Sequence, residues 1–488
     1  EAEKNEKSRS KQVKTWRFKA KDVRDFAFTS SRKFIWDAMG VKFGNRTVMA
    51  MSYYPKEANP LYERYSTRAV AHTLRVYSKY TFEYPYPVAI SVEASNGMEY
   101  PMICFNYGRP EKDGTYTERI KYGMISVIIH EVGHFYFPMI VNSDERQWTW
   151  MDEGLNTYLQ FITEQEWDRN YPSRRGPPKN IVSYMKGNKN NISPIMTNSE
   201  SIYQFGNNAY GKPATALNIL RETIVGRELF DFAFKEYSKT WMFKHPTPSD
   251  FFRILENASA VDLDWFWRGW FYGTDPVDLS IDNVTWYTLD TKNPDIEFPL
   301  RKKKKDEEPI QIWQERNKID IQETVVEIDE VANDFYNKYD PFEVTILDKE
   351  EFSRYRDSSV VEPREKEIYN ANLNYYEIKF SNVGGLVMPI ILQLNYEDGT
   401  DFIIKIPAEI WKMNRKQITK IFATKKQVSS FTLDPKLETA DIDLLNNHWP
   451  RKMIQSKFEL YKSKKLSRGQ SSKENKMQRA KRAKKQSE

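Results

Sequence analysis

The chain has 488 residues, of which 40% are hydrophobic and 14% aromatic, a composition that favours about three packed domains over a disordered protein. Its single cysteine, Cys104, excludes a disulfide scaffold and a structural zinc site built from thiolates. The net charge is +6, but residues 451–488 hold 14 Lys/Arg against 3 Asp/Glu, so the tail carries +11 and the body −5. Because no apolar run is long enough to span a bilayer, we expect a soluble protein without a transmembrane segment.

The first part of the chain predicts an entry segment followed by a mixed α/β layer. Residues 1–35 are polar at their start and mix strand-like alternation with turn residues, as expected for the remnant of a preceding domain. A strand pattern over Arg46–Tyr54 is followed by a helical pattern over Ala69–Tyr80, and strand character returns at 84–94. We expect residues 36–290 to form one catalytic domain.

A glycine-centred bend precedes the next predicted strand, Met102–Tyr107. The sequence there is Asn96-Gly97-Met98-Glu99-Tyr100. A strand at such a bend can lie at a sheet edge and pair with a peptide backbone, while Glu99 presents a carboxylate to a positive group. Taken alone, Glu99 is more often an ordinary surface glutamate.

The most informative stretch is His130-Glu131-Val132-Gly133-His134. His130 and His134 stand four residues apart on an apolar helical pattern, so both imidazoles project from one helix face and can bind one tetrahedral ion. Glu131 points into the same cleft without being a ligand, which lets it take a proton from the attacking water. The pattern predicts a zinc hydrolase.

A third protein ligand for Zn²⁺ is expected from Glu153, because catalytic zinc keeps three protein ligands and one open position. Glu153 opens a second helical pattern, whereas Asp144 and Glu145 lie in the connecting loop. A chance motif on an ordinary buried helix is disfavoured, since the chain has only 5 histidines.

Downstream of this stretch, the loop at 169–181 is a plausible rim of the cleft. Tyr210 precedes a helical pattern, and a phenol at such a position can donate to an oxyanion. With 29 tyrosines in the chain, simple packing is the more common role for any one of them. Two amphipathic helices and an aromatic cluster complete the predicted catalytic domain.

The remaining sequence predicts three further parts. Residues 291–370 read as a charged linker with an amphipathic helix at 319–340, and residues 371–450 as a small β-sandwich, because apolar residues there alternate with period two. Residues 451–488 form a basic tail, expected to be mostly disordered after about Leu466. The tail could contact anionic surfaces, but we expect no nucleic-acid partner.

Together these motifs resemble the gluzincin zinc aminopeptidases, the relatives of aminopeptidase N and leukotriene hydrolase, over about residues 26–286. The bend resembles the family's GxMEN motif with Tyr100 in place of Asn, Asp152-Glu153-Gly154 resembles NEG, and Tyr210 stands in YGKPA where the family has YxKG. The resemblance implies that Glu99, with Gly97 and Met98, binds the substrate's free α-amine. It also implies that Tyr210 stabilises the transition state.

The expected fold is therefore α+β and multidomain: a thermolysin-like catalytic domain with a mixed sheet and a helical lobe, a helical linker and a C-terminal β-sandwich. The expected function is removal of N-terminal residues from peptides with a free N-terminus. Three alternatives stay open: a zinc endopeptidase or an epoxide hydrolase on the same scaffold, and a non-catalytic peptide-binding scaffold. The resemblance also suggests that an N-terminal β domain is missing from this chain and that the protein is exported or located in the cell envelope.

Overall fold

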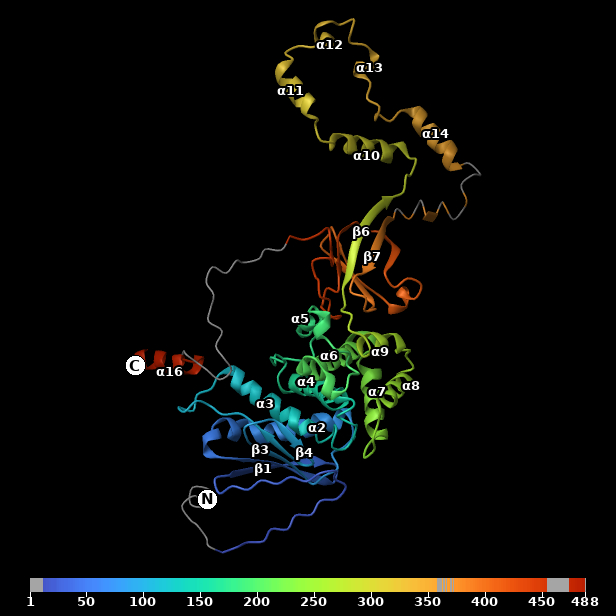
Figure 1. The fold of residues 1–488 in the computed structure, drawn as a ribbon. Coiled ribbons are helices and arrows are strands. Elements are labelled where there is room, and N and C mark those ends of the chain that lie inside the picture. Colours follow the sequence, from blue (N-terminus) through green and yellow to red (C-terminus); the bar gives the residue numbers. More distant parts are fainter. Residues whose placement is uncertain are drawn as a thin grey trace.

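The computed structural model describes residues 12–357, 362, 365, 367, 368, 371, 373–453 and 474–487. Its N-terminal half is built on a five-stranded sheet with the order β1-β2-β3-β5-β4 (Figure 1). The strands are β1 (Ile35–Phe43), β2 (Arg46–Tyr54), β3 (Val88–Glu93), β4 (Met98–Tyr100) and β5 (Ile103–Asn106). β2, β3 and β5 run parallel, whereas β1 and β4 pair antiparallel at the two ends. The order places β4, which carries Glu99, at one edge of the sheet.

Two helices cover one face of this sheet, α2 (Thr67–Tyr80) and α3 (Glu118–Gly133). In α2 the buried residues Val70, Leu74 and Tyr77 recur at helical spacing and pack into the core. In α3 the buried residues Ile125, Ile128, Ile129 and Val132 occupy more than one face, because the helix is enclosed between the sheet and a second layer of helices. The motif helix is therefore a central element.

The second layer is a helical lobe. It consists of α4 (Leu155–Trp167), the short α5 (Val182–Met185), α6 (Lys212–Ile219), α7 (Arg227–Thr240), α8 (Pro248–Ser259) and α9 (Asp264–Trp270). The aromatic cluster predicted from the sequence lies in this lobe, where Trp150, Phe251, Phe252, Trp267 and Phe271 contact one another through their rings. These rings fill the core of the lobe.

The C-terminal strands form two sheets. The first contains β10 (Gln417–Thr424), β7 (Asn374–Asn382) and β6 (Leu279–Thr288), and the second contains β12 (His448–Trp449), β11 (Val428–Leu433), β8 (Ile390–Tyr396) and β9 (Asp401–Ile406). Tyr376 of the first sheet contacts Phe431 of the second with ring centroids 5.4 Å apart. Both are buried, as expected where two sheets pack face to face.

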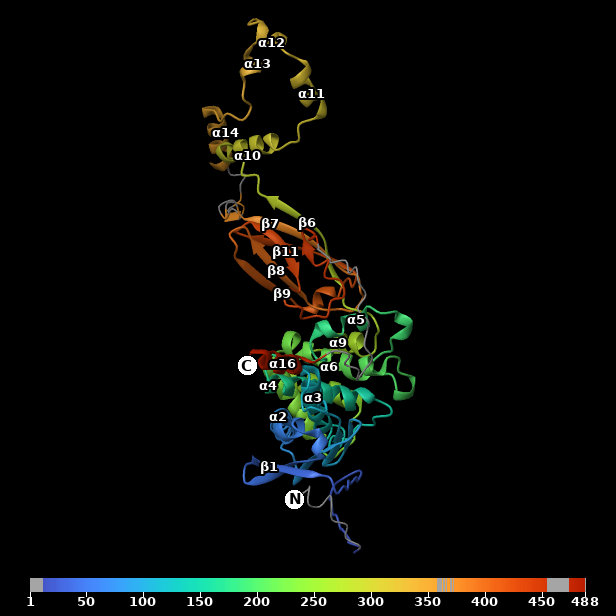
Figure 2. The same ribbon diagram turned by 90° about the vertical axis from the view of Figure 1, so that its left-hand side faces the viewer.

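The structure differs from the sequence-based boundaries at β6. Leu279–Thr288 was expected at the end of the catalytic segment, but it pairs antiparallel with β7, so it belongs to the C-terminal sheets. The residues between β6 and β7 form α10 (Pro294–Asp306), α11 (Ile312–Asp320), α12 (Val325–Ile328), α13 (Phe335–Lys338) and α14 (Ile346–Asp357). Both views show these helices projecting beyond the sheets (Figures 1 and 2).

The single amphipathic helix expected at 319–340 is likewise interrupted. The described structure has α12 and α13 there, and the apolar residues of this stretch, such as Ile319, Val331 and Phe335, are exposed. An amphipathic helix is stabilised mainly by packing of its apolar face, so without a packed face the segment breaks into short helices.

The basic tail is described only in part. Most of the stretch expected to be disordered lies outside the described residues, but Lys476–Ser487 forms a helix, α16. Its first turn is tied to the loop before α3, because Asn475 Nδ2 donates to Thr115 Oγ1 at 3.0 Å. This helix corrects the expectation of a disordered end. In the described part of the chain, no helix has the length and apolar character needed to cross a membrane.

Candidate active site

The two histidines of the motif lie at the C-terminal end of α3. The helix begins after Thr117, whose side chain accepts a hydrogen bond from the Ile120 amide at 3.2 Å. His130 and His134 are one turn apart, both are buried, and their Nε2 atoms are 3.1 Å apart. Helical spacing brings the two imidazoles together, and nitrogen atoms at this separation can bind one metal ion.

Glu153 brings the third ligand atom to the same point. It lies on the helical turn Trp150–Gly154 that leads into α4, and its Oε2 is 3.0 Å from His130 Nε2 and 3.4 Å from His134 Nε2. Gly154 lets this turn lie against α6, because a Cβ there would be 2.6 Å from Pro213 Cγ. The close packing of the two helices thus fixes Glu153.

The three atoms fit a zinc ion. Ligands about 2.0–2.1 Å from a tetrahedral ion lie roughly 3.3 Å from one another, which is close to the three observed separations. Two imidazoles and one carboxylate are also a donor set found in catalytic zinc sites. Burial lowers the pKa of His130, so its imidazole is held neutral, the form that binds a metal.

The other ring nitrogens are held by groups that sequence reasoning missed. His130 Nδ1 is 2.9 Å from Gln160 Oε1, and His134 Nδ1 is 2.9 Å from the Phe137 carbonyl oxygen. Asp152 Oδ1 is also 2.9 Å from His134 Nδ1, without the angle of a hydrogen bond. Burial, followed by the charge of Glu153, raises the Asp152 pKa to about 8. Gln160 could have been predicted from the sequence, since it lies two helical turns after Glu153 and so faces the same side.

Glu131 lies beside the metal-ligating residues without joining them. Burial raises its pKa well above the ordinary range, although the charge of His134 opposes this, and Glu99 and Glu153 raise it further. A carboxylate that binds a proton this readily is suited to take one from water and to give it up again.

The β4 edge approaches Glu131 closely. A Cβ on Gly97 would lie 2.4 Å from Glu131 Oε1, so any larger residue here would require the Glu131 carboxylate to shift. The negative charge of Glu99 helps to raise the Glu131 pKa, and Glu99 has an oxygen within 4.8 Å of ligand atoms of His134 and Asp152. Met98 does not join this group, since its side chain is 47% exposed.

Tyr210 completes the cluster from the turn before α6. Its hydroxyl donates to Glu153 Oε1 at 2.6 Å, and its ring stacks on His130 with centroids 5.6 Å apart. Burial raises its pKa, and the negative charge of Glu153 adds to the effect, so the phenol stays protonated. A protonated phenol beside the ligand cluster can donate a hydrogen bond to a substrate oxygen.

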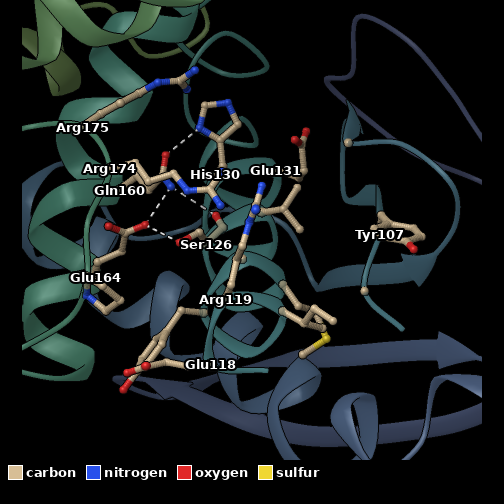
Figure 3. A pocket seen from close by; sticks show the side chains of 18 of the residues that line it. Tyr107, Glu118, Arg119, Ser126, His130, Glu131, Gln160, Glu164, Arg174 and Arg175 are labelled. Atoms are coloured by element: carbon tan, nitrogen blue, oxygen red, sulfur yellow. Dashed lines mark hydrogen bonds between the residues drawn. The ribbon is translucent and has the colours of Figure 1, made fainter. Parts of the chain in front are cut away.

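These side chains open into a cleft of about 1270 Å³ that runs along α3 (Figure 3). Gly97, His130, Glu131 and Tyr210 are among its lining residues, and Arg174 and Arg175 come from the loop predicted as a rim. The structure therefore brings Glu99, Glu131, the three ligand candidates and Tyr210 to one place. The roles assigned to them from the sequence stay predictions.

Comparison with known proteins agrees with this geometry. Residues 65–270 match the Peptidase family M1 domain. The match confirms the resemblance to the aminopeptidase N family that the motifs indicated.

The relatives that match this part of the chain are aminopeptidases. Glutamyl aminopeptidase of Sus scrofa is 29% identical over 28% of this chain and 15% of its own length. Probable aminopeptidase 1 of Sulfurisphaera tokodaii is 24% identical over 43% of this chain and 29% of its own. The chain thus spans less than a third of either relative.

A solved structure shows the same fold. The crystal structure of Legionella pneumophila aminopeptidase A in complex with aspartic acid superposes with a TM-score of 0.51 and 15% identity, over 84% of this chain and 38% of that one. This likeness confirms the expected α+β multidomain fold with a thermolysin-like catalytic domain.

Proposed function

We propose that the protein is a zinc-dependent aminopeptidase that removes N-terminal residues from peptides. One observation carries the proposal: the side chains of His130, His134 and Glu153 converge within metal-ligand distance, with Glu131 and Tyr210 beside them. The M1 domain match and the aminopeptidase relatives support it.

His130, His134 and Glu153 would hold the ion. When bound, zinc supplies Lewis acidity that polarises the scissile carbonyl and makes a water molecule more acidic. Glu131 takes the proton from the attacking water and passes it to the leaving amine. The environment that raises its pKa suits both steps.

Tyr210 and Glu99 orient the substrate around this centre. The Tyr210 hydroxyl donates to the oxygen that becomes negative as the carbonyl is attacked, and the hydrogen bond to Glu153 keeps it close to that point. Glu99, on the edge strand, pairs with the α-ammonium group and so restricts cleavage to the first residue. Gly97 leaves room for Glu131 between these two contacts.

The test is hydrolysis of aminoacyl anilides by the zinc-loaded protein. We expect turnover that a chelator abolishes and that Glu131→Gln lowers by about 10²–10⁴-fold, with zinc still bound. Glu166→Gln is the matched control, because Glu166 lies on α4 but pairs with Lys79 away from the cleft. Chelator-insensitive turnover, or an undiminished rate in Glu131→Gln, would contradict the proposal.

The same assay separates the alternatives. Cleavage of N-acetylated peptides at the same rate as free peptides would indicate an endopeptidase. Hydrolysis of an epoxide with no peptide cleavage would indicate an epoxide hydrolase. Stoichiometric zinc with no turnover on any peptide would indicate a binding scaffold.

Location and surface contacts form a further part of the proposal. We infer that the protein acts in the cell envelope, supported by the likeness of its Gly97–Tyr100 motif to that of exported members, and that α16 contacts anionic lipid. The positive charge of α16 supports the second point. Cell fractionation and sedimentation with anionic vesicles test the two statements separately.

A further inference from the structure

The cleft continues past the catalytic cluster on the side of His130 away from Glu131. Figure 3 shows Arg174 and Arg175 there, near Gln160 of α4 and Ser126 of α3. Glu131 lies on the opposite side of His130 (Figure 3). The two arginines and the proposed general base are thus on different sides of His130.

Arg175 is half-buried beside Tyr210. Its guanidinium carbon lies 4.2 Å from the centre of the Tyr210 ring, and burial lowers its pKa. The charges of Tyr210 and Glu153 raise the same pKa, whereas the positive charge of Arg174 lowers it, so charges of both signs act on the Arg175 guanidinium. Arg174, the neighbouring residue, is exposed. A partly desolvated guanidinium such as that of Arg175 is stabilised by an anion that reaches it, and the charge of Arg174 adds to that attraction.

The nearby carboxylates are engaged elsewhere. Glu164 accepts hydrogen bonds from Ser126, Gln160 and Ser173. Glu153 faces the two histidines and Tyr210. Among the described residues, no carboxylate lies within ion-pairing distance of Arg174 or Arg175, so both retain hydrogen-bond donors directed to the cleft.

The position of the pair defines which part of a substrate it meets. In the proposed reaction Glu99 holds the N-terminal residue on the β4 side, and the scissile carbonyl lies at Tyr210. The chain then leaves past Tyr210, where Arg175 stacks. The residue after the scissile bond is the first to reach the arginines.

We propose that Arg174 and Arg175 bind a carboxylate on the second residue of the substrate, so that the enzyme prefers peptides with an acidic second residue or dipeptides with a free C-terminus. This inference rests on the proposed aminopeptidase function. The acidic side chain of the second residue and the C-terminus of a dipeptide both present a carboxylate. A guanidinium can bind a carboxylate through two parallel hydrogen bonds.

The preference is confined to the inner part of the cleft. Elsewhere the lining of the cleft holds Glu111 and Glu118 together with Arg109 and Arg119, so positive and negative side chains offset one another there. Acidic residues at the third and later positions are therefore expected to have a much smaller effect than one at the second.

The kinetic test compares isosteric amidated tripeptides. Ala-Asp-Gly amide is expected to have a kcat/KM about 10- to 100-fold above that of Ala-Asn-Gly amide, the range of one charge-assisted contact. The second comparison is Ala-Gly against Ala-Gly amide, which reports the C-terminal carboxylate. If the carboxylate is preferred in only one of the two comparisons, that comparison shows whether the enzyme recognises the side-chain carboxylate or the C-terminal one.

Variants assign the preference to the arginines. Arg175→Gln and, separately, Arg174→Gln are expected to bring the Asp-to-Asn ratio close to one while hydrolysis of the Asn peptide continues. Arg174→Gln is informative because the cation contact with the Tyr210 ring is made by Arg175 and not by Arg174. A smaller Asp-to-Asn ratio of kcat/KM in this variant therefore cannot be explained by displacement of Tyr210. Arg169→Gln is the charge-matched control, since Arg169 is exposed in the same loop and does not line the cleft.

Binding to Glu131→Gln separates this inference from the proposed function. Calorimetry with the same tripeptides reports the carboxylate preference without turnover. If binding shows the preference but the wild-type protein cleaves neither peptide, the proposed function fails and this inference stands. If both peptides are cleaved and bound equally well, or if the ratio survives in both arginine variants, the inference is overturned.

Discussion

Gly97 and Glu131 meet so closely that a Cβ on Gly97 would lie 2.4 Å from Glu131 Oε1. The edge strand and the motif helix are thus fitted to each other at the proposed general base. Gly97→Ala is expected to displace the Glu131 carboxylate and to lower kcat/KM by about 100-fold, the order expected for a misplacement of about 1 Å. Anilide kinetics measure the change. Zinc content and melting temperature are the controls, and an active Gly97→Ala enzyme would show that Glu131 need not occupy its observed position.

Tyr210→Phe tests the hydroxyl alone. The ring can still stack on His130, but the 2.6 Å hydrogen bond to Glu153 and the donor to the substrate are lost. We expect kcat to fall by about 10²–10³-fold with little change in KM, as for the loss of one oxyanion donor. Bound zinc should remain near one equivalent. A tenfold rise in KM at constant kcat would instead assign Tyr210 to ground-state binding.

Gln160→Ala tests the support of the first ligand. Gln160 Oε1 accepts a hydrogen bond from His130 Nδ1 at 2.9 Å, and such contacts orient a ligating imidazole. We expect zinc affinity to fall by about 10–100-fold in competition with a chelator. Gln165→Ala on the same helix is the control, because its amide donates to Ser173 and not to a histidine. Equal zinc affinities of the Gln160→Ala and Gln165→Ala variants would contradict this role for Gln160.

The buried ion pair of the helical lobe is expected to matter for stability. Arg221 is 7% exposed and donates to both oxygens of Asp231 at 2.6 and 2.8 Å. Asp231→Asn leaves Glu222 as the remaining carboxylate partner of the guanidinium, at 2.8 Å, and should lower the free energy of unfolding by about 1–3 kcal/mol, the cost of weakening a hydrogen bond between charged groups. Urea denaturation measures this. A decrease in the free energy of unfolding below about 0.5 kcal/mol would show that the pair contributes no more to stability than an exposed ion pair.

Stability should depend on pH through Asp441. Burial raises its pKa to about 7 in the folded protein, against about 4 when unfolded. The folded state therefore binds more protons between these values, and stability falls as pH rises from about 4 to 7. Asp441→Asn removes this pH-dependent contribution. The stability of the variant relative to wild type should therefore increase from about pH 4 to 7 and stay constant above about pH 7. Melting temperatures at several pH values check this, and a difference independent of pH would contradict it.

The sequence was most informative where function depends on local spacing. His130, Glu131 and His134 lie within one helical turn, so their shared direction follows from the helix itself. Glu153 follows from its place at the start of the next helix. Tyr210 could be selected only by resemblance, because its approach to Glu153 depends on packing between α4 and α6.

The remaining features depend on contacts between distant segments. Arg175 belongs to a loop without periodicity, and only the fold places it over Tyr210. β6 pairs with β7 across the long 289–373 connection, so no local pattern separates it from the catalytic segment. The helix expected at 319–340 is a case where the local pattern misleads. The apolar pattern of a helix is present, but its apolar side chains are exposed and do not pack against another described element.

The most direct test of the central claim is the cleavage of one peptide in two forms, with a free and with an acetylated N-terminus, by the zinc-loaded protein. If Glu99 binds the α-ammonium group while Glu131 activates water, only the free peptide loses its first residue, and Glu99→Ala narrows the difference between the two forms. Equal cleavage of both forms by the wild-type protein would contradict the assignment of an aminopeptidase.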